Sequence, residues 1–220
     1  MKIRSKYELF EFIGAELSWR RHEMTNMRAM VEGSRRAQQK LAIRSSIVMM
    51  YSHWEGFVKN TAKAFLYYLN SQGYKYSQLK SNFSAVGIIN VAGGENSQIN
   101  TQRAALLYDF LMMQHANETF SVDADKYVNT KSNLNSEVLK EILYKLGIPE
   151  KQFATYYVIL DSSLLKRRNE IAHGENTEAR ADSALDLDGF ILLYEKTFEL
   201  ITLYKSEIEN HIYTDGFLSG

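Results

Sequence analysis

One short stretch of the chain gathers the polar side chains best suited to chemistry on a phosphate. Residues 164–176 read Leu-Leu-Lys-Arg-Arg-Asn-Glu-Ile-Ala-His-Gly-Glu-Asn. On a helix, Asn169 and His173 project from nearly the same face, because successive residues turn by about 100°. Arg168 lies roughly 140° from His173 around the axis. Its long side chain can still bend toward the imidazole if the last turn opens before Gly174.

These side chains suit the cleavage of RNA. RNA carries its own nucleophile, the 2′-hydroxyl beside the scissile phosphate, so a catalyst must accept a proton, stabilise the phosphorane and align the groups. A histidine exchanges protons near neutral pH, which makes His173 the candidate acid and base. Arg168 offers a charged, forked donor to phosphate oxygens, and Asn169 can orient the imidazole or the phosphate. Lys166 and Arg167 are candidate contacts to the RNA backbone.

The same residues resemble the signature of the HEPN superfamily. There, an arginine is followed by a polar residue and, after four to six residues, by a histidine, as in Arg168, Asn169 and His173. The run His-Trp-Glu-Gly-Phe at residues 53–57 is similar to one that accompanies this signature in a bacterial branch of the superfamily. The resemblance implies an all-helical bundle and a metal-independent endoribonuclease of bacterial defence or toxin-antitoxin systems, with a cognate antitoxin or inhibitor as possible partner.

One motif histidine per chain offers a single group for two proton transfers. In the HEPN superfamily two such motifs commonly meet across a homodimer, and the resemblance implies the same here. We therefore expect a two-fold dimer in which the segments from Leu164 to Gly174 face each other. Glu170 opposes phosphate binding in this cleft unless Arg167 or Arg168 pairs with its carboxylate.

The sequence says less about the individual residues of the run at 53–57 than about the motif at 164–176. Trp54 and Phe57 are predicted to pack in the core, and Gly56 to let a neighbouring helix approach closely. For His53 and Glu55 we favour a surface or supporting position over catalysis and assign no chemical step.

Composition indicates an all-α fold. The chain has 220 residues, of which 45% are hydrophobic, and only one proline and 12 glycines, which favours long helices over many tight turns. The 26 basic residues equal the 26 acidic ones, so no global field attracts nucleic acid or a membrane, and RNA contacts must be local. Cysteine is absent and no apolar run of about 18 residues occurs. We expect a cytoplasmic protein that needs no metal or cofactor and contacts no membrane.

Apolar periodicity predicts the elements. Helices are expected at about 5–31, 35–71, 98–117, 133–146 and 185–211, and residues 74–132 indicate an insertion within a single domain of residues 1–220. Residues 161–163 either cap a new helix or lie inside a continuous one. The basic run at residues 19–22 is predicted to be a solvated face, residues 175–183 a loop, and residues 214–220 a frayed end.

Two other functions stay open at this stage. The helical face around residue 170 could bind a partner protein or a nucleotide without catalysis, which the neutral net charge favours. Nucleotidyl transfer rests only on the association of HEPN proteins with nucleotidyltransferases, and the chain lacks the paired carboxylates with a Gly-Ser turn that this reaction needs. Gly93-Gly94 is not followed by the Lys-Ser/Thr of a phosphate loop, and Asp123 and Asp125 lack the spacing of a calcium loop.

Overall fold

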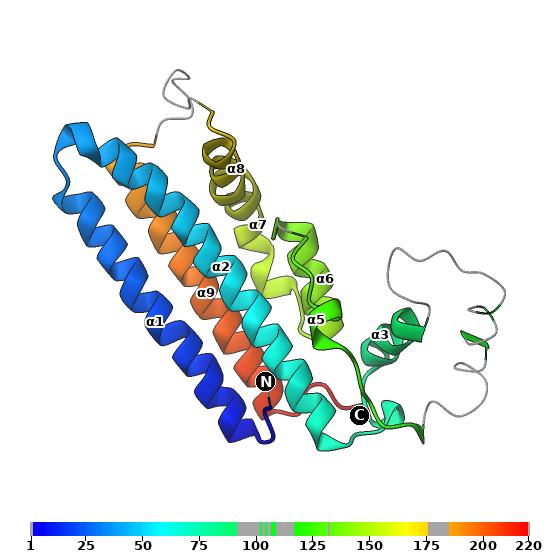
Figure 1. Cartoon of the computed structure of the whole chain (residues 1–220). Helices are drawn as coiled ribbons and strands as arrows, with labels where there is room; N and C mark the ends of the chain where they lie inside the picture. The colour runs from blue at the N-terminus through cyan, green and yellow to red at the C-terminus, as the bar shows by residue number, and fades with distance from the viewer. Residues whose placement is uncertain are drawn as a thin grey trace.

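Three long helices form the centre of the fold in the computed structural model, which describes residues 2–91, 102, 104, 107, 108, 117–131, 133–175 and 185–219. They are α1 (Lys6–Gly33), α2 (Arg36–Gln72) and α9 (Leu187–Tyr213). In Figure 1 they lie side by side, with α1 running opposite to α2 and α9. In the described ranges the only β-structure is a pair of isolated bridges. The predicted all-α bundle is confirmed.

Polar caps and a glycine set the ends of these helices. Ser5 caps α1 by accepting a hydrogen bond from the Glu8 N–H at 3.1 Å, and Asp186 caps α9 by accepting one from the Gly189 N–H at 2.9 Å. Helix α2 ends at Gly73, whose φ of 71° is readily adopted only by a residue without a Cβ atom. The predicted bounds of all three helices are confirmed to within two residues.

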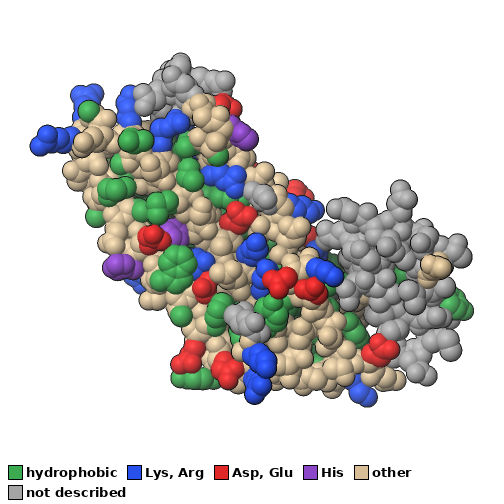
Figure 2. Space-filling view, in the orientation of Figure 1, with side chains coloured by type: hydrophobic (Ala, Val, Ile, Leu, Met, Phe, Trp, Pro, Cys, Tyr) green, Lys and Arg blue, Asp and Glu red, His purple; other side chains and the backbone are tan. Residues whose placement is uncertain are grey.

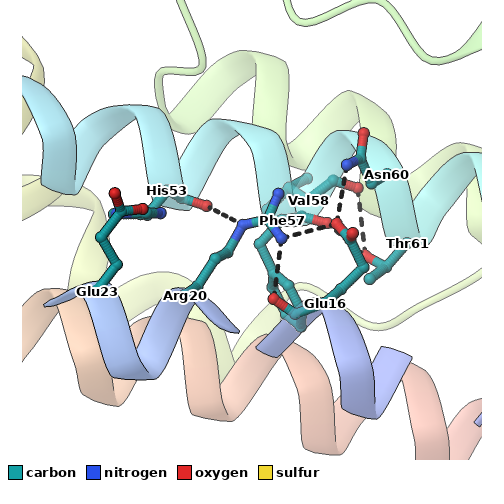
Figure 3. Close-up of polar contacts among 8 residues, drawn as sticks. All are labelled: Glu16, Arg20, Glu23, His53, Phe57, Val58, Asn60 and Thr61. Carbon is teal, nitrogen blue, oxygen red and sulfur yellow. Dashed lines mark hydrogen bonds and ion pairs between the residues drawn. The ribbon is translucent and has the colours of Figure 1, made fainter. Parts of the chain in front are cut away.

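A buried arginine joins α1 to α2 (Figure 3). Arg20 is only 3% exposed. Its Nε donates to the backbone oxygen of His53 at 3.2 Å, and its Nη1 donates to the backbone oxygen and to Oε2 of Glu16, at 2.9 and 2.7 Å. Asn60 donates to the same carboxylate oxygen at 2.8 Å. The predicted solvated face is therefore wrong for Arg20, because these acceptors compensate its burial; Trp19, Arg21 and His22 are exposed, as predicted.

Gly56 provides the space for that arginine. A Cβ atom on Gly56 would lie 3.0 Å from Nη2 of Arg20, closer than ordinary packing allows. The close approach expected at this glycine is present, and the approaching group is the arginine side chain of α1.

Shorter elements cover the other side of α2. They are η1 (Tyr76–Gln78), α3 (Ser81–Val91), α5 (Ala124–Tyr127), α6 (Ser136–Leu146) and a helical segment over residues 151–172. Figure 1 shows α6 and α8 on the side of α2 that faces away from α1. The predicted stop after α6 is confirmed, since Gly147 follows it with a φ of 72°.

The end of the described chain is packed, not frayed. Phe217 is fully buried, and its ring meets those of Phe65 and Tyr74 with 5.7 Å between the centroids in each pair. Its backbone oxygen accepts a hydrogen bond from the Lys80 N–H at 3.0 Å. The prediction for residues 214–220 is therefore wrong for the described residues 214–219, because one buried aromatic ring anchors the tail.

Two expected elements cannot be compared with the structure. The helix expected at 98–117 and the loop expected at 175–183 fall largely outside the described residues. Among the helices that are described, none combines the length and the apolar character needed to cross a membrane.

Candidate functional site

The motif lies at the end of one continuous helical segment. This segment passes through η3 (Lys151–Tyr156), α7 (Tyr157–Ile159), the π-helical η4 (Leu160–Leu165) and α8 (Lys166–Ala172). Residues 161–163 therefore lie within a helix and do not start a new one. A π-helical turn is rare and changes the angular register of everything after it, so it determines how α8 presents its side chains.

An aspartate of the π-helical turn is bound to α6. The Asp161 carboxylate accepts a hydrogen bond from the Ser136 N–H at 2.8 Å and another from the Ser136 hydroxyl at 2.5 Å. Asp161 thus satisfies a backbone N–H at the start of α6, alongside the cap provided by Asn135. This contact fixes the start of α6 next to the segment that carries the motif.

Arg168 is held by residues from three parts of the chain. Its Cζ lies 4.1 Å from the centroid of the Tyr51 ring, and its Nη2 lies 3.7 Å from a carboxylate oxygen of Glu55. Its Nη1 donates to the amide oxygens of Asn169, at 2.8 Å, and of Asn133, at 3.3 Å. The side chains of Arg168 and Glu55 are each 20% exposed. The guanidinium therefore has a fixed position and remains in contact with solvent.

Tyr51 and Glu55 form the wall of this site on α2. They are one helical turn apart, so both face α8. The Tyr51 hydroxyl accepts a hydrogen bond from the Leu134 N–H at 2.5 Å. Burial raises the pKa of Tyr51 to about 12; Glu55 adds to the rise, while the Leu134 N–H and Arg168 oppose it. The phenol is thus protonated at neutral pH and acts as a neutral ring beneath the arginine.

His173 occupies the exposed C-terminal cap of α8. Its N–H donates to the backbone oxygen of Asn169 at 2.9 Å. Gly174, with a φ of 72°, donates to Ile171 at 3.1 Å, and Glu175 donates to Glu170 at 2.9 Å. This pair of bonds is the Schellman arrangement, which glycine makes possible by adopting the left-handed conformation. His173 is exposed, and the described residues provide no hydrogen-bond partner for its imidazole.

The sequence-predicted residues are only partly brought together. The Asn169 side chain binds Arg168, as the distances above show, so its amide oxygen holds the guanidinium. Lys166 is exposed and Arg167 is half-buried at the start of α8. Glu170 is half-buried. Arg168 pairs with Glu55, and the pairing of Glu170 with Arg167 or Arg168 stays a prediction.

His53 belongs to a different site from Glu55. Its side chain is 6% exposed, and its Nε2 lies 3.2 Å from a carboxylate oxygen of Glu23 on α1, without hydrogen-bond geometry. The Trp19 ring meets it edge-on at 5.4 Å. Burial is the main cause of the lowered pKa of His53. The two polar residues of the 53–57 run thus point to opposite neighbours, His53 to α1 (Figure 3) and Glu55 to α8.

Sequence reasoning missed two residues of the site. They are Tyr51 on α2 and Asn133, which lies just before α6. The four-residue spacing of Tyr51 and Glu55 on one helix was a signal for the first. No sequence signal connects Asn133 with Arg168, because their contact spans 35 residues and depends on tertiary packing.

Comparison with known proteins adds one positive finding. A family model described as RiboL-PSP-HEPN matches residues 15–210, a range that includes both the Arg20 cluster and the surroundings of Arg168. Searches of curated proteins and of solved structures gave no match.

Proposed function

Because the chain belongs to the RiboL-PSP-HEPN family, we propose that it is a metal-independent endoribonuclease in which the RNA 2′-hydroxyl attacks the adjacent phosphate. The placement of Arg168 carries this proposal. A charged, forked donor is held by an aromatic ring, a carboxylate and two amides, five residues before an exposed histidine. A guanidinium fixed in advance can stabilise developing charge on phosphate oxygens without reorganising in the transition state.

Each side chain has a defined role in this reaction. His173 accepts the proton of the 2′-hydroxyl as the bond from the 2′-oxygen to phosphorus forms. The bond from phosphorus to the 5′-oxygen breaks, and that oxygen receives a proton from a second imidazole. Arg168 binds the phosphate oxygens, and Asn169 maintains its orientation. The products are a 2′,3′-cyclic phosphate and a 5′-hydroxyl end.

The second imidazole comes, in this proposal, from a second copy of the chain. The exposure of Ala172, His173 and Gly174 at the end of α8 supports a two-fold dimer in which the segments from Leu164 to Gly174 face each other across one cleft. Adding excess His173→Ala chains to wild type would form mixed dimers that have one imidazole in place of two. We expect cleavage to fall below that of the same amount of wild type alone; an unchanged cleavage rate would argue against a shared cleft.

The reaction is tested by incubating total RNA with the protein in the presence of EDTA. Wild type should cleave the RNA, whereas Arg168→Ala and His173→Ala should each be slower by a factor of at least about 100, the usual contribution of a proton-transfer or charge-stabilising group. Lys2→Ala, an exposed change outside the site, serves as the control. Equal cleavage by all four proteins would exclude the proposed roles.

We place this activity in bacterial defence or a toxin-antitoxin system, with a cognate antitoxin or inhibitor as partner. Expression of wild type in a bacterial cell should then arrest growth, and expression of His173→Ala should not. Growth arrest by both proteins, or by neither, would count against the toxin role. The alternative, a non-catalytic binding module, predicts RNA or nucleotide binding without cleavage in the EDTA assay.

A further inference from the structure

The start of α2 carries basic residues without acidic neighbours in sequence. Between Glu32 and Glu55 the chain has Arg35, Arg36, Lys40 and Arg44 and no aspartate or glutamate. This is a marked local imbalance in a chain whose net charge is zero. Glu32, the last carboxylate before the basic residues, is already paired with Arg28 at 2.9 Å.

Three of these residues form a basic stripe, defined as Arg36, Lys40 and Arg44. Steps of four residues advance by about 40° around a helix, so the three side chains follow one side of α2. Arg36 and Lys40 are exposed, and Arg44 is half-buried. Figure 2 shows Lys and Arg side chains gathered at the upper left, the end of the molecule at which α2 begins in Figure 1.

The stripe leads to the candidate catalytic site. Tyr51, which lies under the Arg168 guanidinium, is seven residues after Arg44 and within about 20° of it around α2. Nη2 of Arg44 donates to the backbone oxygen of Glu175 at 3.2 Å, two residues after His173. From Arg36 to Tyr51 the helix rises about 22 Å. This side of α2 thus contacts the motif segment twice, through Tyr51 at Arg168 and through Arg44 at Glu175.

One charge of the stripe is unfavourable for the helix itself. A cation in the first turn of a helix opposes its dipole, and α2, which begins at Arg36, has no acidic residue in its first turn and no side-chain cap at Arg35. The stability of the helix therefore does not account for Arg36. A polyanion lying along the stripe would interact favourably with the positive end of the helix.

We propose that the basic stripe binds the phosphate backbone of the single-stranded RNA that enters the Arg168 and His173 site. This inference rests on the proposed function for the direction of the strand. A single strand is required because attack by the 2′-oxygen in line with the departing 5′-oxygen needs a backbone that is free to rotate. The contacts are to phosphates, so they supply affinity and register without base preference.

The test measures binding of wild type and variants to a fluorescein-labelled, 2′-O-methylated oligouridylate, which lacks the free 2′-hydroxyl and so remains uncleaved. Anisotropy titrations over a range of salt concentrations give the slope of log K against log salt. Removing two phosphate contacts in the double variant R36Q/K40Q should weaken binding and reduce the steepness of that slope by about 1.4. The control K2Q/K75Q removes the same charge from exposed lysines elsewhere and should match wild type.

The outcomes separate this inference from the proposed function. Equal affinities and slopes for the two double variants would reject RNA binding by the basic stripe, even if cleavage depends on Arg168 and His173. A selective loss of binding in R36Q/K40Q, in a protein that never cleaves RNA, supports the stripe and rejects the nuclease. A wild type that binds no RNA rejects both. Matching thermal unfolding midpoints for the two double variants exclude a folding defect as the cause of a difference.

Discussion

The guanidinium of Arg168 lies over the ring of Tyr51, with 4.1 Å between Cζ and the ring centroid. Tyr51 belongs to α2 and Arg168 to α8, so a long helix of the bundle sets the position of the group proposed to bind phosphate. A contact of this kind contributes about 0.5–2 kcal/mol, depending on how far it is removed from water. Its larger effect is geometric, because it limits the rotamers that the arginine can adopt.

Substitutions of Tyr51 separate the ring from the hydroxyl. Tyr51→Phe keeps the ring and should keep most of the RNA cleavage, while leaving the Leu134 N–H without its acceptor at a cost of roughly 1–3 kcal/mol in folding free energy. Tyr51→Leu removes the ring under Arg168 and should lower kcat/KM about tenfold relative to Tyr51→Phe. Cleavage kinetics and urea unfolding measure the two effects. Equal kcat/KM values for both variants would show that the ring does not position the arginine.

The sequence predicted the bundle well for a physical reason. The three long helices bury one face along many turns, and their caps and terminal glycines are local signals that periodicity reveals. Arg168, Asn169 and His173 could be singled out because they lie in one short stretch of the chain that resembles the HEPN signature. Whether they act as predicted is a question for the cleavage assays.

Contacts between distant segments could not be predicted. The sequence left the state of residues 161–163 open because Asp161 resembles a cap for its own helix, whereas its carboxylate binds Ser136 at the start of α6. Arg20 was assigned to a solvated face because the sequence does not show that the backbone of α2 supplies one of its hydrogen-bond acceptors. Phe217 was missed because a short tail has too few residues to show periodicity.

Two glycines in helices should respond in opposite ways to alanine. At Gly14 a Cβ atom meets nothing within 4 Å, so Gly14→Ala should raise the free energy of unfolding by about 1 kcal/mol through helix propensity. At Gly56 the added methyl meets Arg20, which three hydrogen bonds hold in place, so Gly56→Ala should lower stability by about 1–3 kcal/mol. Chemical denaturation measures both. A Gly56→Ala chain as stable as Gly14→Ala would show that Arg20 moves aside at little cost.

The contact between Asp161 and Ser136 should couple stability to activity. Asp161→Ala leaves the Ser136 N–H at the start of α6 without this acceptor, and should cost about 1–2 kcal/mol, as the loss of a helix cap does. Cleavage should fall as well, because Asn133, just before α6, contacts Arg168. Ser162→Ala, an exposed change on the same turn, is the control and should stay within about 0.5 kcal/mol of wild type. Full activity in a destabilised Asp161→Ala chain would uncouple α6 from the site.

Stability should decline as the pH falls below neutral, through His211. Burial, with a smaller contribution from Lys80, lowers the pKa of His211 to about 4, compared with about 6.5 in an unfolded chain. Between pH 4 and pH 6.5, His211 is protonated in the unfolded chain but not in the folded chain. The free energy of unfolding therefore falls as the pH is lowered from about 6.5 toward 4, by at most about 1.4 kcal/mol per pH unit. Urea unfolding of wild type and His211→Gln at several pH values should show a shallower decline in the variant. Identical declines would assign the effect to other groups.

The most direct test of the proposed mechanism uses a defined RNA in which a single nucleotide, on the 5′ side of a mapped cleavage site, is replaced by its 2′-deoxy form. In EDTA, wild type should cut the unmodified RNA to a 2′,3′-cyclic phosphate and a 5′-hydroxyl. It should leave the phosphate after the deoxynucleotide intact. The His173→Ala variant should form neither product. Cleavage at the deoxynucleotide, or undiminished cleavage by His173→Ala, would contradict attack by the 2′-hydroxyl with this histidine as the proton acceptor.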